Sequence, residues 1–313
     1  MNGDNISKTS GTLIPSQLSL KRIGLGTVQF GVDYGITNAK GKVPQAEAKK
    51  ILTHAATIGI NMIDTACQYG NSESVIGTLN SDIYQFKIVT KTPVSNNPKI
   101  DSSFCNEVIL KFQSSLSNLG INKAYGLLVH NASDILKPGS EKLIEALEMI
   151  RLSGNVEKIG VSIYDAHDIE AILKIFLPDI IQVPLNILDQ RLIKSGSLYE
   201  LKKRGIEVHS RSLFLQGILL ENSNLLPNYF FPIRHCFQSI ENFAKEQKLT
   251  QLELCLLFGL SVTEVDRLII GIASFHEFLK LKASLAKIIN YQAEDMAHLS
   301  ISEEKYINPS LWP

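Results

Sequence analysis

Short apolar segments alternate with amphipathic helical patterns along almost the whole chain, and this alternation restricts the fold more than any other feature of the sequence. Each apolar segment has the length and composition of a strand that is buried on both faces of a parallel sheet. We predict eight such strands, at Ile23–Leu25, Asn61–Ile63, Lys87–Thr90, Gly126–Val129, Lys158–Val161, Ile180–Val183, Glu207–His209 and Leu268–Ile270.

Helical patterns occupy the stretches between these strands. In Gln45–Ile58 the apolar residues fall on one helical face, and Gly59 ends the pattern. Further helices are predicted at Ser74–Leu79, Glu107–Leu119, Glu141–Leu152, Ala166–Phe176, Ser195–Arg204 and Phe275–Leu285. An eight-fold alternation without a linker predicts an α/β fold, namely a (β/α)8 TIM barrel. Because the 313 residues are 44% hydrophobic, one large core is expected, and we predict a single domain over residues 1–313.

Three segments lie outside this alternation. Residues 1–10 are predicted to be disordered, and β-like stretches at Leu13–Ile14 and Leu18–Leu20 predict an N-terminal β-hairpin that closes the barrel floor. A long loop is predicted at residues 213–234, after strand seven, and two additional helices are then predicted over 235–247 and 250–260.

The third segment is the C-terminal tail, residues 296–313, which contains the only tryptophan. Long loops and tails on the catalytic face of a barrel usually shape its substrate pocket. The sequence leaves two positions open for this tail, one near the active site and one elsewhere on the barrel.

Charge and composition exclude several classes of partner. Lys plus Arg and Asp plus Glu both number 31, so the net charge is zero and gives no reason to expect nucleic acid or an anionic membrane surface. The first residues are polar, and no apolar run approaches the roughly 18 residues that a membrane span needs. The four cysteines lack metal-type spacing and are typical of reduced thiols, so we predict a cytoplasmic protein without a metal site.

Polar or ionisable side chains end three consecutive strands of the predicted barrel. Asp64 and Tyr69 follow the second strand, Lys91 ends the third, and His130 ends the fourth. Each has an ordinary structural explanation alone: a capping carboxylate, a half-buried phenol, a solvated lysine or a core histidine. Because parallel strands bring their carboxyl ends to one rim, the four together indicate a site.

At these residues the sequence resembles the aldo-keto reductase superfamily, over roughly residues 20–285. The resemblance rests on five motifs in order: Asp64-Thr-Ala-x-x-Tyr69-Gly-x-x-Glu73, Lys91, His130, Lys158-Ile-Gly-Val-Ser162 and Gln182-Val-Pro-Leu-Asn186. It implies a catalytic tetrad formed by Asp64, Tyr69, Lys91 and His130.

The reaction explains why these residue types are needed. Reduction of a carbonyl requires a hydride on carbon and a proton on oxygen, and a tyrosine with a pKa near 10 is a weak proton donor at neutral pH. We expect the Lys91 ammonium to lower the pKa of Tyr69, and Asp64 to keep Lys91 charged and oriented. His130 is expected to direct the carbonyl toward Tyr69 by a hydrogen bond.

No G-x-G-x-x-G motif opens a helix, so a Rossmann nucleotide site is not supported. The resemblance instead implies an extended dinucleotide across the barrel mouth, NADP in the form NADPH, with NAD as the alternative. It implies a cofactor-binding set formed by Gly26, Thr27, Asp64, Ser162, Gln182, Arg211, Ser212, Leu213, Gly271 and Ser274.

The chain departs from the family pattern at two of these positions. Arg211 stands where the family usually has an aromatic residue on the nicotinamide, so its guanidinium could stack there or bind an anionic substrate group. After strand eight, where Lys or Arg often holds the 2′-phosphate of NADP, Ser274 remains but no basic residue follows until Lys280. The helix N-terminus at Ser274 could still receive a phosphate.

The leading hypothesis is an NAD(P)H-dependent oxidoreductase that reduces an aldehyde, ketone or sugar carbonyl, with Tyr69 as general acid. Arg211-Ser-Leu-Phe-Leu-Gln-Gly217 and Asn308-Pro-Ser-Leu-Trp312 are similar to bacterial members associated with surface-sugar biosynthesis. One alternative is a cofactor-binding regulatory subunit with little or no turnover, and another is an enzyme that forms a Schiff base through Lys91. The expected partner is a small carbonyl substrate, and the oligomeric state is left open.

Overall fold

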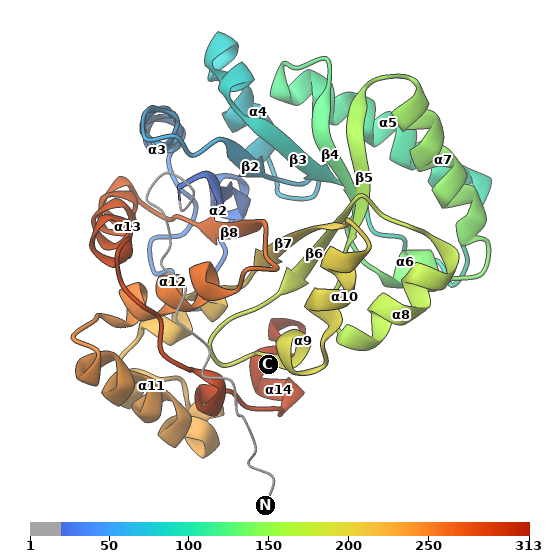
Figure 1. Cartoon of the computed structure of the whole chain (residues 1–313). Coiled ribbons are helices and arrows are strands. Elements are labelled where there is room, and N and C mark those ends of the chain that lie inside the picture. Colours follow the sequence, from blue (N-terminus) through green and yellow to red (C-terminus); the bar gives the residue numbers. More distant parts are fainter. Residues whose placement is uncertain (1–19) are drawn as a thin grey trace, which may run out of the picture.

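The computed structural model describes residues 20–313, and its centre is a closed barrel of eight parallel strands in sequence order (Figure 1). Each strand pairs with its successor, and β8 pairs with β1 to close the ring. The strands are β1 (Ile23–Gly26), β2 (Met62–Asp64), β3 (Lys87–Lys91), β4 (Ala124–Val129), β5 (Val156–Ser162), β6 (Ile180–Pro184), β7 (Glu207–Arg211) and β8 (Arg267–Gly271). The predicted (β/α)8 barrel and all eight predicted strands are confirmed. The predicted N-terminal hairpin and the disordered lead lie outside the described residues.

Helices surround this ring of strands (Figure 1). The α-helices are α2 (Val28–Gly31), α3 (Gln45–Thr57), α4 (Ser72–Gly77), α5 (Ser102–Leu119), α6 (Ser133–Leu136), α7 (Ser140–Leu152), α8 (Ala166–Ile175), α9 (Arg191–Lys194), α10 (Ser197–Lys203), α11 (Arg234–Glu246), α12 (Gln251–Ser261), α13 (Phe275–Ile288) and α14 (Glu304–Ile307). Short 3-10 helices lie at η1 (Asn80–Gln85), η2 (Leu215–Leu220), η3 (Ser223–Leu225), η4 (Asn228–Ile233), η5 (Ala297–Leu299) and η6 (Pro309–Leu311).

Two predicted helices differ from the structure for identifiable reasons. Helix α5 begins one and a half turns before the predicted Glu107, because the Asp101 carboxylate accepts a hydrogen bond from Phe104 N at 3.0 Å and caps the helix there. The helix predicted over Ser195–Arg204 begins two residues later, as α10 at Ser197, because Gly196 has a φ of 74° and separates it from the preceding short helix α9.

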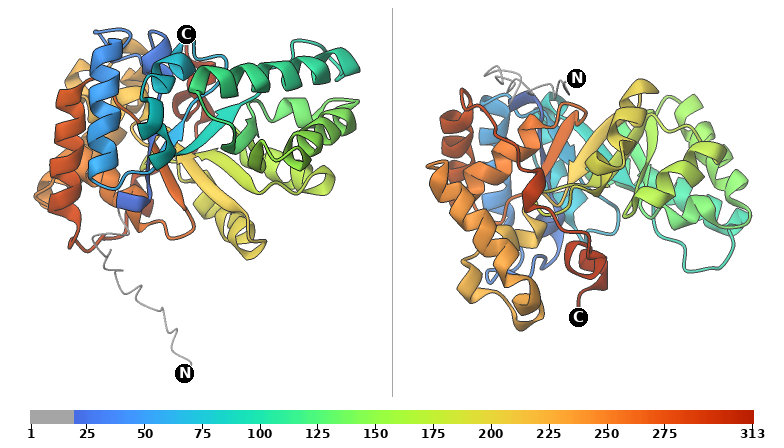
Figure 2. Two further views of the ribbon diagram at one scale, coloured as in Figure 1. Left: turned by 90° about the horizontal axis from the view of Figure 1, so that it is seen from above. Right: turned by 60° about the horizontal axis from the view of Figure 1, so that its bottom comes forward.

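The segment between β7 and β8 contains the two predicted additional helices, α11 and α12. Helix α12 packs against both α11 and α13, so these three helices lie together on one side of the barrel (Figure 2). The long loop predicted at 213–234 is confirmed as a long connection between β7 and α11, and it contains the three 3-10 helices η2 to η4.

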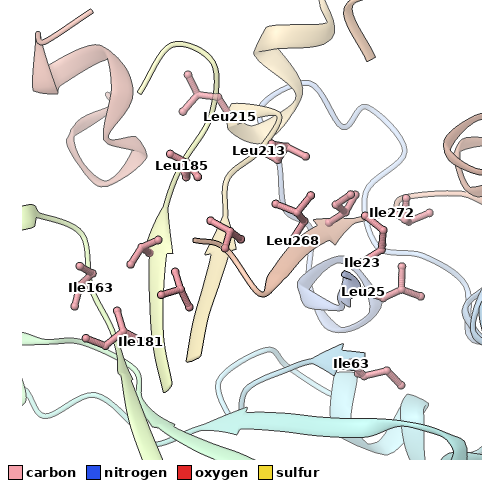
Figure 3. Packing of buried hydrophobic residues seen from close by; sticks show 14 of the residues in the cluster. Ile23, Leu25, Ile63, Ile163, Ile181, Leu185, Leu213, Leu215, Leu268 and Ile272 are labelled. Carbon is pink, nitrogen blue, oxygen red and sulfur yellow. The ribbon is translucent and has the colours of Figure 1, made fainter. Parts of the chain in front are cut away.

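Buried apolar side chains form two layers. The larger lies between the strands and the surrounding helices and includes Leu25, Ile63, Ile181 and Leu268 (Figure 3). The smaller is separate from it and is formed by Met62, Val89, Tyr125, Leu128, Ile180 and Ile269. Because strand side chains alternate between two faces, residues of these two layers alternate along β2, β6 and β8.

The same alternation determines what stands at the barrel mouth, by which we mean the carboxyl-terminal ends of the strands. On five strands, a residue of the smaller layer is followed two positions later, on the same face, by a polar residue or a glycine. The five pairs are Met62 and Asp64, Val89 and Lys91, Leu128 and His130, Ile180 and Gln182, and Ile269 and Gly271. The apolar interior of the barrel therefore ends at the mouth in a ring of polar side chains and one glycine.

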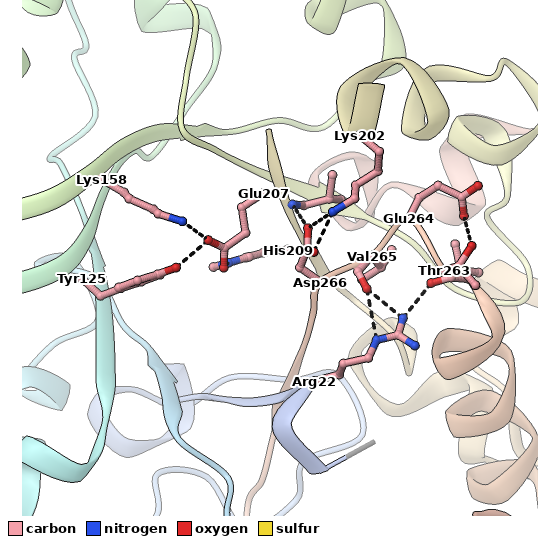
Figure 4. A network of polar contacts seen from close by, with 12 residues as sticks. Arg22, Tyr125, Lys158, Lys202, Glu207, His209, Thr263, Glu264, Val265 and Asp266 are labelled. Atoms are coloured by element: carbon pink, nitrogen blue, oxygen red, sulfur yellow. Dashed lines mark hydrogen bonds and ion pairs between the residues drawn. The ribbon is translucent and has the colours of Figure 1, made fainter. Parts of the chain in front are cut away.

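The opposite end of the barrel contains a polar network (Figure 4). Glu207, the first residue of β7, accepts hydrogen bonds from Tyr125 Oη at 2.6 Å and from Lys158 Nζ at 2.5 Å, and His209 Nε2 lies 2.8 Å from its other carboxylate oxygen. Although burial alone would raise it, the pKa of Glu207 lies well below its usual value because His209, Lys158 and Tyr125 stabilise the carboxylate.

The C-terminal tail packs beside the segments that follow β6 and β7. Ile301 N donates to Leu188 O at 3.0 Å, and the Trp312 ring lies 5.1 Å from the Phe230 ring in an edge-to-face contact. The tail therefore covers the aromatic side chains of the long loop. Among the described residues, no helix is both long and apolar enough to cross a lipid bilayer.

Candidate active site

The four predicted catalytic side chains meet at the barrel mouth. Asp64 and Lys91 end β2 and β3, His130 follows β4, and Tyr69 lies in the loop between β2 and α4. The Lys91 ammonium nitrogen is 5.1 Å from the centre of the Tyr69 ring, and the Tyr69 and His130 rings are 5.6 Å apart at 81°. The structure therefore brings all four into one cluster.

Lys91 is held by two acceptors, one at the end of β2 and one in the residue that follows it. Its Nζ donates to Asp64 Oδ1 at 2.5 Å and to the carbonyl oxygen of Thr65 at 2.9 Å. Lys91 is 2% exposed and Asp64 is 4% exposed, so the pair is almost completely removed from water. A buried ammonium with two fixed acceptors has little freedom to turn away from Tyr69.

The ionisation of Lys91 and Tyr69 follows from burial and mutual contact. Burial alone would lower the pKa of Lys91, but Asp64 and Tyr69 oppose it, and the pKa lies above its usual value. Burial raises the pKa of Tyr69 and Asp64 raises it further, while Lys91 acts in the opposite direction. The expected lowering by Lys91 is present, but the loss of water around the phenol outweighs it, so the pKa of Tyr69 lies above its usual value. Tyr69 keeps its proton at neutral pH.

His130 is a neutral imidazole in this surrounding. Burial, with a further contribution from Lys91, lowers the pKa of His130 to about 4. Its backbone N–H donates to Thr92 Oγ1 at 3.3 Å, and its Nδ1 is buried without a partner among residues 20–313. A neutral imidazole can donate a hydrogen bond from one ring nitrogen and accept one at the other, so His130 is suited to hold a carbonyl oxygen.

The backbone around Tyr69 is held by a close approach of two glycines. Gly31 ends α2, and a Cβ atom there would collide with the Tyr69 carbonyl oxygen. Gly70 has a φ of 54°, and a Cβ atom there would collide with the Gly31 carbonyl oxygen. Ser72 N donates to Tyr69 O at 3.0 Å, and Ser72 Oγ donates to Thr27 O at 2.8 Å. The predicted cofactor residue Thr27 thus helps to fix the Tyr69 loop.

Gln182 and Ser162 stand next to the catalytic cluster. Ser162 of β5 pairs in register with Gln182 of β6, and both are buried. Gln182 Nε2 donates to Asp64 Oδ2 at 2.7 Å, which leaves its carbonyl oxygen as an acceptor. No side chain of residues 20–313 bonds to the Ser162 hydroxyl, so this pair fits a ligand amide that needs both a donor and an acceptor.

Arg211 is held by groups at the end of β5. Its Nη2 donates to the Ile163 carbonyl oxygen at 2.9 Å and its Nη1 to Ser212 Oγ at 3.3 Å. Its guanidinium carbon lies 4.2 Å from the centre of the Tyr164 ring. Tyr164 was not among the predicted site residues, although it stands two residues beyond Ser162, where the strand alternation would have indicated it.

Glycines keep another part of the mouth open. Gly26 of β1 pairs in register with both Asp64 and Gly271. A Cβ atom at Gly26 would lie 3.2 Å from Ile269 Cγ2, and one at Gly271 would lie 2.9 Å from the Gln29 amide. Because Gln29 Oε1 is buried without a partner among the described residues, this glycine-lined stretch fits a polar ligand.

The loop after β7 has a strained backbone. Ser212 and Gln216 have φ values of 63° and 55°, which residues other than glycine rarely adopt. Gln216 accepts hydrogen bonds from Thr37 Oγ1 at 3.1 Å and from Ile36 N at 3.3 Å, which fix this loop to the one after β1. Leu213, which follows Ser212 in this loop, is only 2% exposed.

Ser274 caps helix α13, where its Oγ accepts a hydrogen bond from Glu277 N at 3.2 Å. This residue lies after β8, apart from the catalytic cluster. Within residues 20–313, no group of three or more His, Cys, Asp or Glu side chains could hold a metal ion.

Comparisons with known proteins agree with this arrangement. A sequence model described as the Aldo/keto reductase family matches residues 22–304. A glyoxal reductase from Bacillus subtilis (strain 168) is 29% identical over 185 residues, which are 57% of this chain and 62% of that protein. The match thus spans less than two thirds of the length of that relative.

Solved structures share the fold at lower sequence identity. The aldo-keto reductase AKR11C1 from Bacillus halodurans, in its holo form, has a TM-score of 0.64 at 18% identity, over 89% of this chain and 95% of that one. PA4992 from Pseudomonas aeruginosa, a protein assigned to the aldo-keto reductases, has a TM-score of 0.63 at 20% identity, over 85% of this chain and 90% of that one.

Proposed function

This chain belongs to the aldo/keto reductase family, whose members are NAD(P)H-dependent carbonyl reductases, and we propose that it reduces a small aldehyde, ketone or sugar carbonyl with Tyr69 as general acid. The observation that carries this proposal is the buried Lys91–Asp64 pair, whose ammonium lies 5.1 Å from the centre of the Tyr69 ring. A protonated phenol, a fixed ammonium and a neutral imidazole around one point are what carbonyl reduction needs.

Each member of the cluster has a separate task. Tyr69 donates its proton to the carbonyl oxygen as negative charge develops there, and the adjacent Lys91 ammonium stabilises the phenolate that remains. Asp64 keeps Lys91 charged and in place, and the neutral His130 orients the carbonyl oxygen toward Tyr69 by a hydrogen bond.

The residues at the mouth fit a nicotinamide cofactor, which when bound supplies the hydride. Ser162 and the free carbonyl oxygen of Gln182 together offer a donor and an acceptor to a carboxamide. The open backbone at Gly26 and Gly271 leaves room for the rest of the dinucleotide, and the strained loop at Ser212 and Leu213 offers backbone groups to its pyrophosphate. We propose Arg211 as a residue that contacts either the nicotinamide or an anionic substrate group.

We propose the class of substrate from the carbonyl compounds that the related proteins indicate. The Bacillus subtilis relative carries the name glyoxal reductase, so small dicarbonyl compounds come first. Sugar carbonyls come second, because of the similarity to members associated with surface sugars. The test is the loss of NADH or NADPH absorbance against a panel of glyoxal, simple aldehydes, ketones, free sugars and nucleotide-activated sugars. Turnover of none of these, with the protein folded, would contradict the proposal.

The two alternative functions make different predictions in the same experiment. A regulatory subunit would bind the dinucleotide without turning over any carbonyl. A Schiff-base enzyme would trap a carbonyl substrate on Lys91 under borohydride, but the raised pKa of Lys91 keeps its amine protonated and non-nucleophilic. Covalent trapping that disappears in Lys91→Met would favour that chemistry over ours.

A further inference from the structure

We infer that Glu47 and Glu277 make the adenosine end of the cofactor site selective for a ribose with a free 2′-hydroxyl, so that this enzyme uses NADH in preference to NADPH. The inference rests on the proposed function, since it concerns the cofactor of that same reaction. It also replaces the expectation of NADPH that the family resemblance gave.

Backbone N–H donors follow β8, at the start of α13. In the family pattern this is where the 2′-phosphate of NADP is held, and the free N–H groups at the start of a helix are natural phosphate donors. Here the backbone N–H groups of residues 273, 275 and 277 each have a partner within the protein. Ala273 N donates to Glu277 Oε2 at 2.9 Å, and Phe275 N donates to Glu47 Oε1 at 2.7 Å. The N–H of Glu277 itself donates to Ser274 Oγ at 3.2 Å.

Two of these three partners are carboxylates, and they come from two different helices. Glu277 belongs to the first turn of α13, and Glu47 belongs to the first turn of α3, 228 residues before Phe275. A 2′-phosphate would have to displace a carboxylate from its N–H donors and then remain beside the same negative charge. The phosphate and the carboxylate are both negative and repel each other. Binding of the phosphate is therefore disfavoured by the displaced hydrogen bonds and again by this repulsion.

A free 2′-hydroxyl meets the opposite situation. A carboxylate only accepts hydrogen bonds, and a ribose hydroxyl can donate one without displacing the backbone N–H, since each carboxylate has a second oxygen. An acidic residue on the ribose 2′-hydroxyl is also the chemistry by which Rossmann folds select NAD.

Positive charge in this region does not offset the repulsion of a 2′-phosphate by Glu47 and Glu277. The Lys50 ammonium lies 4.0 Å from the centre of the Phe275 ring and interacts with the ring face. Position 273, between the strand end and the helix cap, is an alanine, so no cation projects from the loop itself.

The test measures binding without turnover. NAD⁺ and NADP⁺ are titrated into the unmodified protein by calorimetry in the absence of any carbonyl substrate, and we expect NAD⁺ to bind at least tenfold more tightly. The variants Glu47→Gln and Glu277→Gln keep an oxygen that can cap the helix but lose the charge. Each variant should lower the ratio of NAD⁺ affinity to NADP⁺ affinity at least threefold, mainly by strengthening NADP⁺ binding. Glu141→Gln, which changes the same residue type in the first turn of α7, is the matched control and should leave the ratio unchanged.

A second measurement separates charge from structure. Because Glu277 is exposed, its repulsion of a phosphate should weaken as salt increases, so the preference for NAD⁺ should shrink with ionic strength in the unmodified protein and less in Glu277→Gln. If Glu47→Gln fails to fold, the exposed Glu277→Gln variant still provides the test.

The outcomes distinguish this inference from the function on which it rests. Equal or tighter binding of NADP⁺ by the unmodified protein overturns the inference and leaves the reductase intact. A preference for NAD⁺ that neither variant changes overturns the assignment to Glu47 and Glu277. Failure to bind either dinucleotide contradicts the proposed function itself.

Discussion

The ammonium nitrogen of Lys91 lies 2.5 Å from Asp64 Oδ1 at the carboxyl ends of two adjacent strands, and both side chains are almost fully buried. Removing either partner leaves an uncompensated buried charge, which typically costs about 3–5 kcal/mol of stability. We therefore expect Lys91→Met and Asp64→Asn each to lower the free energy of unfolding, measured by urea denaturation, and to abolish turnover.

Two comparisons make this prediction specific. The double variant Asp64→Asn/Lys91→Met should be less destabilised than the sum of the two single variants, because it leaves no unpaired charge. Lys287→Met breaks the partly exposed pair with Glu253 at 2.8 Å and should cost no more than about 1 kcal/mol. Equal costs for Lys91 and Lys287 would show that the buried pair has no special role.

Tyr69→Phe tests the general acid directly. It removes the phenolic proton but keeps the ring, so we expect turnover to fall about 10²- to 10⁴-fold, the usual contribution of a positioned acid. Dinucleotide affinity, measured by calorimetry, should stay within a factor of two or so. Tyr199→Phe changes an exposed tyrosine on α10 and is the matched control. Unchanged turnover in Tyr69→Phe would remove Tyr69 as the proton donor.

His130 predicts a pH dependence of stability with a definite sign. Its pKa is about 4 in the folded protein against an ordinary value of 6.5, so the unfolded chain binds the proton more readily. The contribution of neutral His130 to stability is therefore complete above about pH 6.5 and is lost as the pH falls toward 4. His130→Asn should flatten the decline of unfolding free energy over this interval, measured by urea denaturation at several pH values. An unchanged slope would mean that His130 titrates normally.

The sequence could predict the parts of this molecule that depend on local pattern. Strand periodicity located all eight strands, and the residues at the ends of three of them gave Asp64, Lys91 and His130 as neighbours, because parallel strands bring equivalent positions to one rim. The start of α10 after Gly196 was not predicted, because the helical pattern assigned to Ser195–Arg204 continues across the glycine.

Properties set by contacts between distant residues could not be predicted. The raised pKa of Tyr69 depends on how much water the folded protein removes from the phenol, which no spacing encodes. The stacking of Arg211 on Tyr164 and the contact of Glu47 with Phe275 N join segments far apart in the chain. The departures at Arg211 and after β8 were visible in the sequence, but their structural meaning was not.

The contact between Gly31 and the Tyr69 loop predicts a loss of activity without any change in the catalytic side chains. In Gly31→Ala the new methyl group would collide with the Tyr69 carbonyl oxygen, so the loop must move. We expect a destabilisation of about 1–3 kcal/mol, as for other overpacked sites, and a fall in turnover larger than any change in dinucleotide affinity. Gly24→Ala is the control, because its methyl group would meet side-chain atoms of Ile269 and Met62 and not the backbone of the Tyr69 loop. Equal loss of activity in both variants would show that the approach of Gly31 does not position Tyr69.

Glu207 at the barrel floor predicts acid sensitivity that is independent of the active site. Its pKa is lowered in the folded protein, so its contribution to stability is present above its ordinary pKa of 4.5 and is lost as the pH falls below that value. Glu207→Gln removes this contribution and leaves Lys158 and His209 without their carboxylate. We therefore expect a lower unfolding free energy at neutral pH and a weaker decline below pH 4.5, measured by urea denaturation across this range. Because Glu207 lies at the opposite end of the strands from Tyr69, turnover by the folded fraction should be unchanged, and a variant that folds normally but loses activity would contradict the separation of floor and mouth.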